Sequence, residues 1–177
     1  SRGLGDVYKR QNINFINDVS SGSHDSDMLD VVSKLGCSYI MTHMPREHKE
    51  GSIKVYDDIL SEIKTYFTDR IQKCVEAGIS KEKIIIDPGI GFGKSGENNI
   101  NLLKNIKWLK TIHSNVCIGS SNKRYSSQLF KHIQTKEDLR IANLATFATS
   151  TFYGVTYLRV HDVELTKDTV FVINKAV

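Results

Sequence analysis

A carboxylate followed by a glycine-rich loop is the first feature of the sequence that suggests chemistry. Asp87 closes a run of isoleucines, and Pro-Gly-Ile-Gly-Phe-Gly-Lys follows it as far as Lys94. This segment is not a phosphate-binding P-loop, because position 88 is proline where that motif needs glycine, and it also fails the dinucleotide fingerprint. A carboxylate here can accept two N–H bonds from an aminopyrimidine-type ring, with Phe92 available to pack on that ring. A turn or helix-cap aspartate is the structural alternative.

Cationic side chains later in the chain suggest an anion site. Arg159 and His161 alternate in a predicted strand, so their side chains are expected on the same side of the sheet. Two such groups at a strand end suit a phosphate or pyrophosphate, whereas a salt bridge and a core histidine are the structural alternative. Lys123, in Gly-Ser-Ser-Asn-Lys at 119–123, could hold an anion or a carbonyl oxygen, or point into solvent.

The other histidines and the cysteines show no spacing typical of a metal site. Neither HxxxH nor HExxH occurs, so structural or surface roles are expected for these histidines. Cys37, Cys74 and Cys117 lie far apart and form no CxxC pair, which is typical of a reducing compartment. No nucleophile elbow or Cys–His signature appears, so the sequence gives no support to nucleophilic catalysis.

Alternating strands and helices must position these side chains. Short runs of β-branched and aromatic residues, typical of strands buried on both faces, occur at 13–17, 38–42, 83–87, 116–119 and 156–160. Helices are predicted at 27–35, 55–77, 99–110, 136–153 and 165–175. This alternation predicts an α/β fold with a parallel sheet, either open and doubly wound or closed as a barrel. In both, reactive groups collect at the carboxyl ends of the strands.

The composition indicates one globular domain. The chain has 177 residues, of which 40% are hydrophobic and two are proline, so it can build a core. A net charge of +4 without a clustered basic patch does not indicate a nucleic-acid partner. No run of about 18 apolar residues occurs, so no membrane partner is expected. Residues 1–11 carry no hydrophobic period and are interpreted as a non-native or disordered extension of the domain at 12–177.

Several segments, in their order and spacing, resemble the dihydropteroate synthases, which are pterin-binding enzymes of folate biosynthesis. They are Ile-Asn-Asp at 16–18, Tyr-Asp-Asp at 56–58, the segment 74–94 ending in Asp-Pro-Gly-Ile-Gly-Phe-Gly-Lys, Gly-Ser-Ser-Asn-Lys at 119–123 and Leu-Arg-Val-His-Asp-Val at 158–163. The resemblance covers nearly everything after residue 11. It implies a parallel (β/α)8 TIM-type barrel of which this chain holds about the last five β/α units.

The resemblance also implies an activity and a site. The family joins p-aminobenzoate to 6-hydroxymethyl-7,8-dihydropterin pyrophosphate, which gives 7,8-dihydropteroate and pyrophosphate with the help of Mg²⁺. The pterin-binding residues that the resemblance implies are Asn17, Thr42, Asp87, Phe92, Gly119 and Lys123. Ser121 and Lys123 are implied to contact p-aminobenzoate, and Arg159 and His161 to hold the pyrophosphate. The catalytic residues that it implies are Asp87, Lys123, Arg159 and His161.

The chain departs from the family pattern. Thr42 replaces a methionine that packs on the pterin, Asn122 replaces an arginine, and the family's usual basic-Gly segment is reworked to Pro-Arg-Glu-His at 45–48. The first three strands of the family barrel, which supply a metal-contacting asparagine, have no counterpart, so the Mg²⁺ ligand is expected outside this chain. Five strands of a barrel leave two open edges. We therefore expect the 177 residues alone to be inactive and poorly soluble, which assays of the purified chain would test.

Two other functions fit parts of the pattern. A methyltetrahydrofolate-dependent methyltransferase would share the barrel and an Asn/Asp pair for the pterin, but it has no pyrophosphate for Arg159 and His161 to bind. A half-barrel that binds pterin without turnover is the non-enzymatic alternative. The family is often dimeric, so a homodimer is an expectation. The cytoplasm is the expected location, or an organelle if a presequence precedes Ser1.

Overall fold

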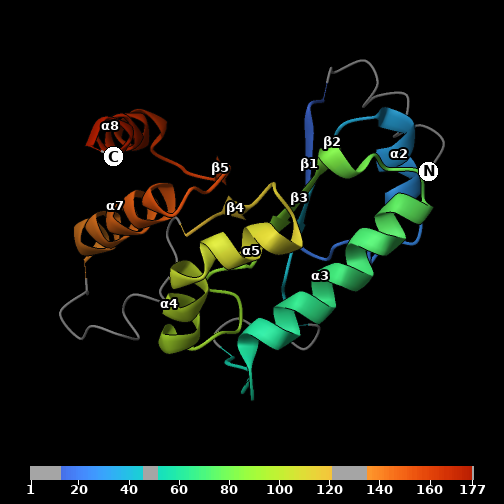
Figure 1. The fold of residues 1–177 in the computed structure, drawn as a ribbon, viewed down its shortest axis with the longest axis horizontal. Coiled ribbons are helices and arrows are strands. Elements are labelled where there is room, and N and C mark those ends of the chain that lie inside the picture. The colour runs from blue at the N-terminus through green and yellow to red at the C-terminus, as the bar shows by residue number, and fades with distance from the viewer. Residues whose placement is uncertain (1–12, 46–51, 121–134, 177) are drawn as a thin grey trace.

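The computed structural model describes residues 13–45, 52–120 and 135–176, in which short strands alternate with helices (Figure 1). The strands are β1 (Phe15–Asp18), β2 (Ser38–Thr42), β3 (Ile84–Asp87), β4 (Cys117–Ile118) and β5 (Tyr157–Leu158). The helices are α2 (Met28–Leu35), α3 (Ile59–Glu76), α4 (Gly96–Lys104), α5 (Ile106–Ile112), α7 (Lys136–Phe152) and α8 (Val163–Ala176), with a 3-10 turn η1 (Lys81–Lys83) before β3.

All strand pairings are parallel within this part of the chain. β1 pairs with β2 and β2 with β3, so that Thr42 lies opposite Asp87 at the ends of their strands. An isolated parallel bridge joins Ile86 of β3 to Val116, the residue before β4, and β4 pairs with β5. Because the neighbouring strands run in step, their carboxyl ends gather at one edge, where the sequence predicts the reactive groups.

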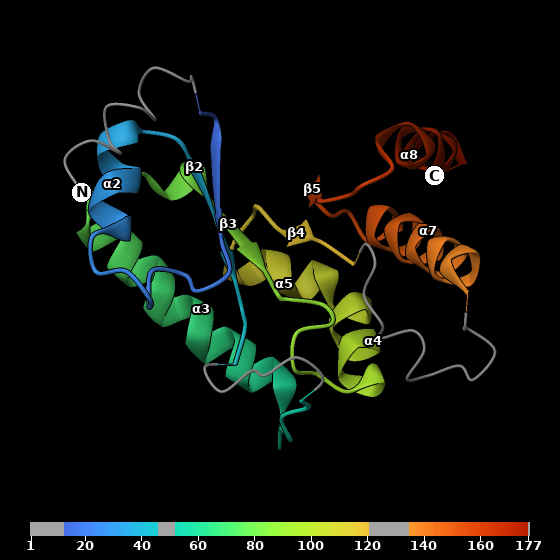
Figure 2. The ribbon, with the colours of Figure 1, turned by 180° about the vertical axis from the view of Figure 1, so that it is seen from behind.

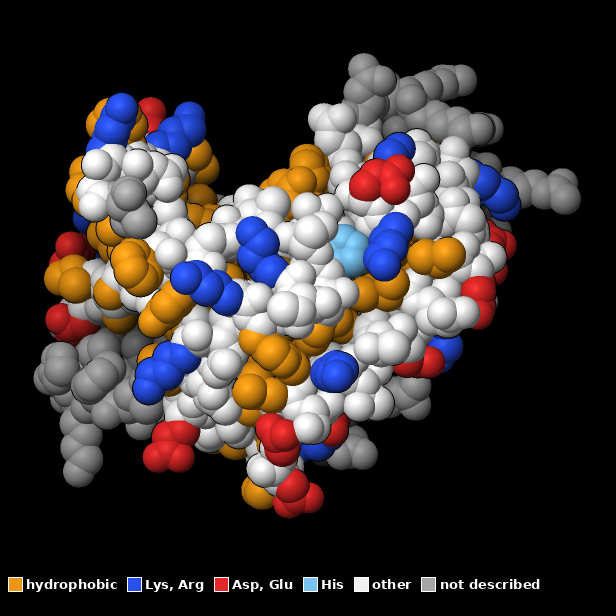
Figure 3. Space-filling model, in the orientation of Figure 1, with side chains coloured by type: hydrophobic (Ala, Val, Ile, Leu, Met, Phe, Trp, Pro, Cys, Tyr) orange, Lys and Arg blue, Asp and Glu red, His pale blue; other side chains and the backbone are white. Residues whose placement is uncertain are grey.

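The helices lie in an arc on the outer side of the strands, from α2 through α3, α5, α4 and α7 to α8 (Figures 1 and 2). Helix α3 contacts α4 and α5, α4 contacts α7, and α7 contacts α8. In the space-filling view a broad hollow separates the α8 side of the molecule from the β1 side (Figure 3). The described strands are therefore covered by helices on their outer side and left open on the other.

The core lies between the strands and the arc of helices. Strand β3 contributes Ile84, Ile85 and Ile86, which are all buried, as the continuous apolar run predicts for a strand enclosed on both faces. Tyr39 of β2 and Phe67 of α3 are also fully buried. Each such side chain contributes about 1.5–3 kcal/mol of stabilisation when it leaves water.

Helix α3 begins later than the predicted range 55–77. Val55 is 87% exposed, and the helix starts at Ile59 because Asp58 is its N-cap residue in an extended conformation. The Asp58 carboxylate accepts the backbone N–H of Leu60 at 3.0 Å, which satisfies one of the free donors of the first turn. The second aspartate of the Tyr-Asp-Asp segment therefore has a structural role.

The single helix predicted at 99–110 was wrong, because two helices occupy this stretch. Asn105 lies between α4 and α5, with φ −104° and ψ 25°, outside regular helical geometry. Its side-chain amide donates to the carbonyl of Asn101 at 2.8 Å and to the Asn101 side chain at 2.9 Å. Asparagine competes in this way with the backbone ladder, so the helix ends and a second one begins.

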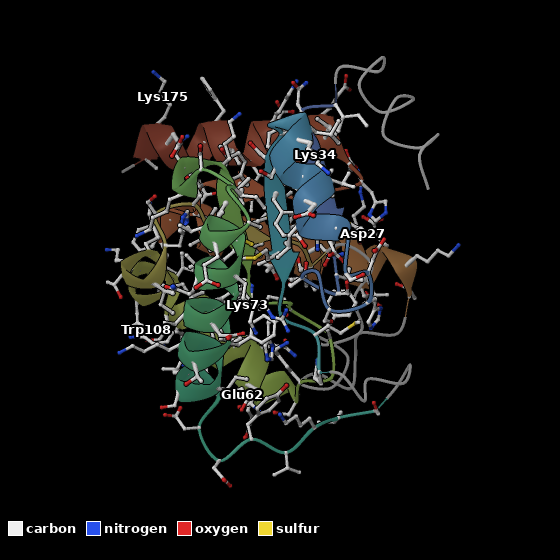
Figure 4. All side chains as sticks on the ribbon, turned by 90° about the vertical axis from the view of Figure 1, so that its right-hand side faces the viewer. Asp27, Lys34, Glu62, Lys73, Trp108 and Lys175 are labelled. Carbon is white, nitrogen blue, oxygen red and sulfur yellow. The ribbon has the colours of Figure 1, made fainter. Side chains whose placement is uncertain are left out.

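The outer faces of α3 and α5 carry charged side chains. Glu62 and Lys73 project from α3, and Trp108 lies on the neighbouring α5 (Figure 4). Lys107 on α5 is exposed, as expected for the solvated helix face that the lysines at 104, 107 and 110 predict. No helix in the described ranges is long and apolar enough to cross a bilayer.

Candidate functional site

Asp87, at the end of β3, lies at the centre of the candidate site. Its side chain is fully buried, and Oδ1 accepts the N–H of Gly89 at 2.8 Å. Oδ2 accepts Nη1 of Arg159 at 2.8 Å and lies 3.5 Å from the Thr42 hydroxyl. Burial raises the pKa of Asp87, whereas Arg159, the Gly89 N–H and the charge of Lys94 oppose the rise. The carboxylate thus accepts a hydrogen bond from the turn that follows it, as expected for a turn aspartate, and it also forms an ion pair with Arg159.

The guanidinium of Arg159 joins three strand ends. Its Nη1 donates to Oδ1 of Asn17, beyond the middle of β1, at 2.8 Å, in addition to its bond with Asp87. Gly119, which follows β4, leaves the space for it, because a Cβ at that position would lie 2.5 Å from Nη2. The side chain of Arg159 is 34% exposed, so the guanidinium lies at the mouth of the site. Residues 142 positions apart in the chain are thus brought into direct contact.

The prediction that Arg159 and His161 alternate within a strand was wrong. Strand β5 is Tyr157–Leu158. The Arg159 N–H donates to the carbonyl of Ile118, and beyond this hydrogen bond the chain leaves the sheet. The carboxylate of Asp162 accepts the N–H of Leu165 at 3.2 Å, which starts α8 directly after the strand. His161 is exposed in this short connection. The shared face inferred from alternation therefore does not apply to the pair.

Asp18 shapes the loop that follows Asn17. Its carboxylate accepts the N–H and hydroxyl of Ser20 at 2.8 and 2.7 Å, the N–H of Gly22 at 2.6 Å and the hydroxyl of Tyr39 at 2.7 Å. Burial acts to raise its pKa, but these hydrogen bonds are together stronger and hold the pKa below the ordinary value. The end of β1, and with it Asn17, is thereby fixed against β2.

The loop after Asp87 makes a tight turn against β2. The N–H of Phe92 donates to the carbonyl of Gly89 at 3.0 Å, and Phe92 is half-buried. Gly89 has φ +72°, and a Cβ there would collide with the backbone carbonyl oxygen of His43. The glycine is required both for its backbone conformation and for this close approach.

Lys94 is the residue in this loop that sequence reasoning missed. Its ammonium is buried and donates to backbone carbonyls, although the sequence suggested only a rejected phosphate motif around it. The signal available was a lysine at the end of a stretch of apolar and glycine residues, because a lysine that such a stretch buries needs hydrogen-bond partners. His43, beside it, is buried against Tyr66 at a ring distance of 4.8 Å. Burial, with the charges of Lys94 and Lys54, lowers the pKa of His43 to about 2, so this imidazole is neutral.

The structure brings most of the predicted pterin residues together. Asn17, Asp87 and Gly119 meet at Arg159, with Thr42 beside Asp87. Phe92 lies on the loop after Asp87. The other predicted residues, Ser121 and Lys123, lie outside the described residues.

Comparisons with known proteins point to one family. The sequence model described as "Pterin binding enzyme" matches residues 9–161. Dihydropteroate synthase of Escherichia coli K12 is 32% identical over 161 residues, which are 89% of this chain and 55% of that protein. A pea protein named "Folate synthesis bifunctional protein, mitochondrial" is 30% identical over 91% of this chain and 33% of its own length. This chain thus spans about half, or less, of the curated relatives that it matches.

Solved structures agree with the sequence match. Xanthomonas albilineans dihydropteroate synthase with 4-aminobenzoic acid superposes with a TM-score of 0.88 at 31% identity, over 99% of this chain and 64% of that one. The Anaplasma phagocytophilum enzyme with bound 6-hydroxymethylpterin-monophosphate gives 0.87 at 26% identity, over 100% of this chain and 69% of that one. These neighbours are TIM-type barrels, so the described strands form part of such a barrel, and the expected barrel is confirmed over an open doubly wound sheet.

Proposed function

This chain belongs to the family of pterin-binding enzymes, and we propose that the protein containing it is a dihydropteroate synthase, in which this chain forms the pterin side of the active site. The observation that carries the proposal is the meeting of Asn17, Asp87 and Arg159 at one edge of the sheet. A matching sequence pattern alone identifies ancestry. The site adds a buried carboxylate that already accepts a hydrogen bond from a planar cation, and such a carboxylate can also accept the N–H donors of a pterin.

The position of Arg159 supports a pterin on Asp87. The aminopyrimidinone edge of a pterin carries neighbouring N–H donors on a flat, guanidine-like group. Arg159 presents a guanidinium of the same kind to Asp87 and Asn17, with both donor–acceptor distances at 2.8 Å. A pterin edge would take over these two acceptors, and Phe92 on the adjoining loop would lie against the ring. We also assign Thr42 and Gly119 to the wall of this pocket.

The proposed reaction forms a C–N bond and breaks a C–O bond. When the bond from the pterin methylene to the diphosphate breaks, its electron pair leaves with the diphosphate and positive charge spreads into the pterin ring. The negative charge of Asp87 stabilises that cation, and Arg159 with His161 binds the leaving diphosphate. The amine of p-aminobenzoate then attacks the methylene, and its proton passes to the released diphosphate or to water. Ser121 and Lys123 are assigned to the p-aminobenzoate side by resemblance.

Mg²⁺ would bind the diphosphate in such an enzyme. In the described part of the chain, no three or more His, Cys, Asp or Glu side chains gather where they could hold a metal ion. The groups that we assign to the diphosphate are Arg159 and His161. A guanidinium binds no cation, and a single imidazole is a poor site for Mg²⁺, which prefers several oxygen ligands. We therefore propose that the metal ligands lie elsewhere in the protein, and the steps above are assigned to this chain's own residues.

The full-length protein should form dihydropteroate from pterin diphosphate and p-aminobenzoate and release one pyrophosphate for each product, because the site holds both the ring and its leaving group. Product formation and pyrophosphate release measured together test this, and a sulfonamide, which mimics p-aminobenzoate, should inhibit both. Pterin binding without turnover would favour the non-catalytic half-barrel. Methyl transfer from methyltetrahydrofolate would favour the methyltransferase.

We further propose that the protein is a homodimer. Exposed apolar side chains on the paired helices α7 and α8 support a contact there, and they include Ile141, Phe152, Phe171 and Val172. The proposed location is the cytoplasm or an organelle, and the name of the pea relative gives a mitochondrial precedent for the latter.

A further inference from the structure

Lys94 is a buried cation outside the set of residues that the resemblance assigns to the site. The residue is 1% exposed. The ammonium donates to the carbonyl oxygens of His43, Gly89 and Phe92, each at 3.0 Å. Burying an ammonium is costly unless acceptors replace its water. Three carbonyl oxygens do so here, and they all belong to the walls of the candidate site.

These contacts fix the loop on which Phe92 lies. The His43 carbonyl belongs to the end of β2, whereas Gly89 and Phe92 belong to the loop after β3, so the ammonium ties two strand ends together. Asn99 of α4 holds the loop from its other side. Its Nδ2 donates to the Lys94 carbonyl at 3.1 Å, and its Oδ1 accepts the N–H of Gly91 at 2.9 Å.

The charge of Lys94 also acts on Asp87. The titratable and charged groups that the described structure places around Asp87 are Arg159 after β5, Cys117 on β4, His43 after β2, and Lys94. Burial raises the pKa of Asp87, and the positive charges of Arg159 and Lys94 both lower it. In the proposed reaction Arg159 leaves Asp87 for the diphosphate. Lys94 is buried and bonded to three carbonyls, so its charge stays beside the carboxylate.

We propose that Lys94 is a positioning residue of the pterin site, which holds the Phe92 loop against β2 and keeps Asp87 ionised when a pterin displaces Arg159. The inference rests on the proposed function and extends it to a residue that contacts no substrate. Lys94 acts through Asp87 and the loop, and it transfers no proton.

The test is the pH dependence of binding of 6-hydroxymethylpterin, without diphosphate, to the full-length protein. Pterin binding needs ionised Asp87, so affinity falls as the pH drops through the pKa of that carboxyl. Lys94→Met removes the charge and raises this pKa further, so the loss should begin about one pH unit higher, and at pH values below both midpoints the affinity should be about tenfold weaker than that of the wild type. Lys94→Arg keeps the charge and should keep the wild-type pH midpoint, with weaker affinity because its larger head disturbs the carbonyls.

Two controls separate this role from general stability. Lys107→Met, on the exposed face of α5, should change neither affinity nor midpoint. Binding of inorganic pyrophosphate should be unchanged in Lys94→Met if the protein is folded. A folded Lys94→Met protein with the wild-type midpoint and affinity would overturn the inference.

The remaining outcomes are also decisive. If Lys94→Met does not fold, Lys94→Arg decides, because a midpoint raised by about one unit in that variant would contradict a role for the charge. A wild-type protein that binds pyrophosphate but no pterin would refute the proposed function itself, and the inference with it.

Discussion

Replacing Asp87 with asparagine should weaken pterin binding by about 100-fold or more while the protein stays folded. The carboxylate can accept two N–H bonds, whereas an asparagine side chain presents one oxygen and an NH₂ group that opposes the second donor. The free energy of unfolding should change by less than about 2 kcal/mol, because removing a buried charge offsets the lost ion pair. Arg159 can turn to solvent, since it is 34% exposed.

Titration calorimetry with a pterin, together with urea unfolding, measures both quantities. Asp69→Asn is the matched control, because Asp69 is an exposed carboxylate on α3 that pairs with Lys73 at 2.8 Å. This variant should bind pterin as the wild type does. Unchanged binding in Asp87→Asn would place the pterin elsewhere, and a collapse of its stability would mean that Asp87 is chiefly structural.

The second large effect is expected at Gly89, where an alanine should lower the free energy of unfolding by about 3 kcal/mol or more. Two costs add at this position. The backbone has φ +72°, which disfavours any side chain, and the new Cβ would collide with the carbonyl oxygen of His43. That oxygen belongs to the backbone of the neighbouring chain segment and also accepts Lys94, so it cannot move aside cheaply.

Gly154→Ala is the comparison that separates the two costs. Gly154 has φ +80°, but the nearest atom to its added Cβ is the flexible Lys110 Nζ at 3.9 Å. Only the backbone cost applies there, about 1 kcal/mol. Chemical denaturation of both variants measures the difference. Equal losses of unfolding free energy at the two glycines would show that the collision with His43 does not contribute.

The architecture was largely predictable from the sequence. The buried isoleucines before Asp87, and the spacing of five such runs, predict parallel strands whose ends gather the polar residues. The break at Asn105 was not predictable from hydrophobic periodicity, because the apolar stripe continues across it while the side-chain amide interrupts the backbone. The strand predicted at 156–160 is shorter in the structure, because its pairing as β5 covers only Tyr157–Leu158 although the apolar pattern continues to Val160.

The candidate site was predictable in its residues but not in its contacts. Asp87 and Arg159 stand out by type and position, yet their ion pair depends on how strands far apart in the chain close toward each other. Lys94 was missed for a different reason. Its three acceptors are backbone carbonyls, which every residue possesses, so no residue type in the sequence marks them.

The bonds that Arg159 makes have a thermodynamic consequence. The Arg159 guanidinium already occupies acceptors on Asp87 and Asn17, so a pterin binds by exchange with a group that has a similar planar set of N–H donors but carries a positive charge. When a pterin takes its place, the Arg159 guanidinium becomes available to a diphosphate. Conversely, a diphosphate that binds Arg159 leaves the acceptors on Asp87 and Asn17 available to a pterin. Under the proposed function, ring and diphosphate therefore assist each other's binding, by the same factor in both directions because such coupling is reciprocal. A substrate that carries both parts gains from this coupling, whereas a bare pterin must displace the arginine without a new partner for it.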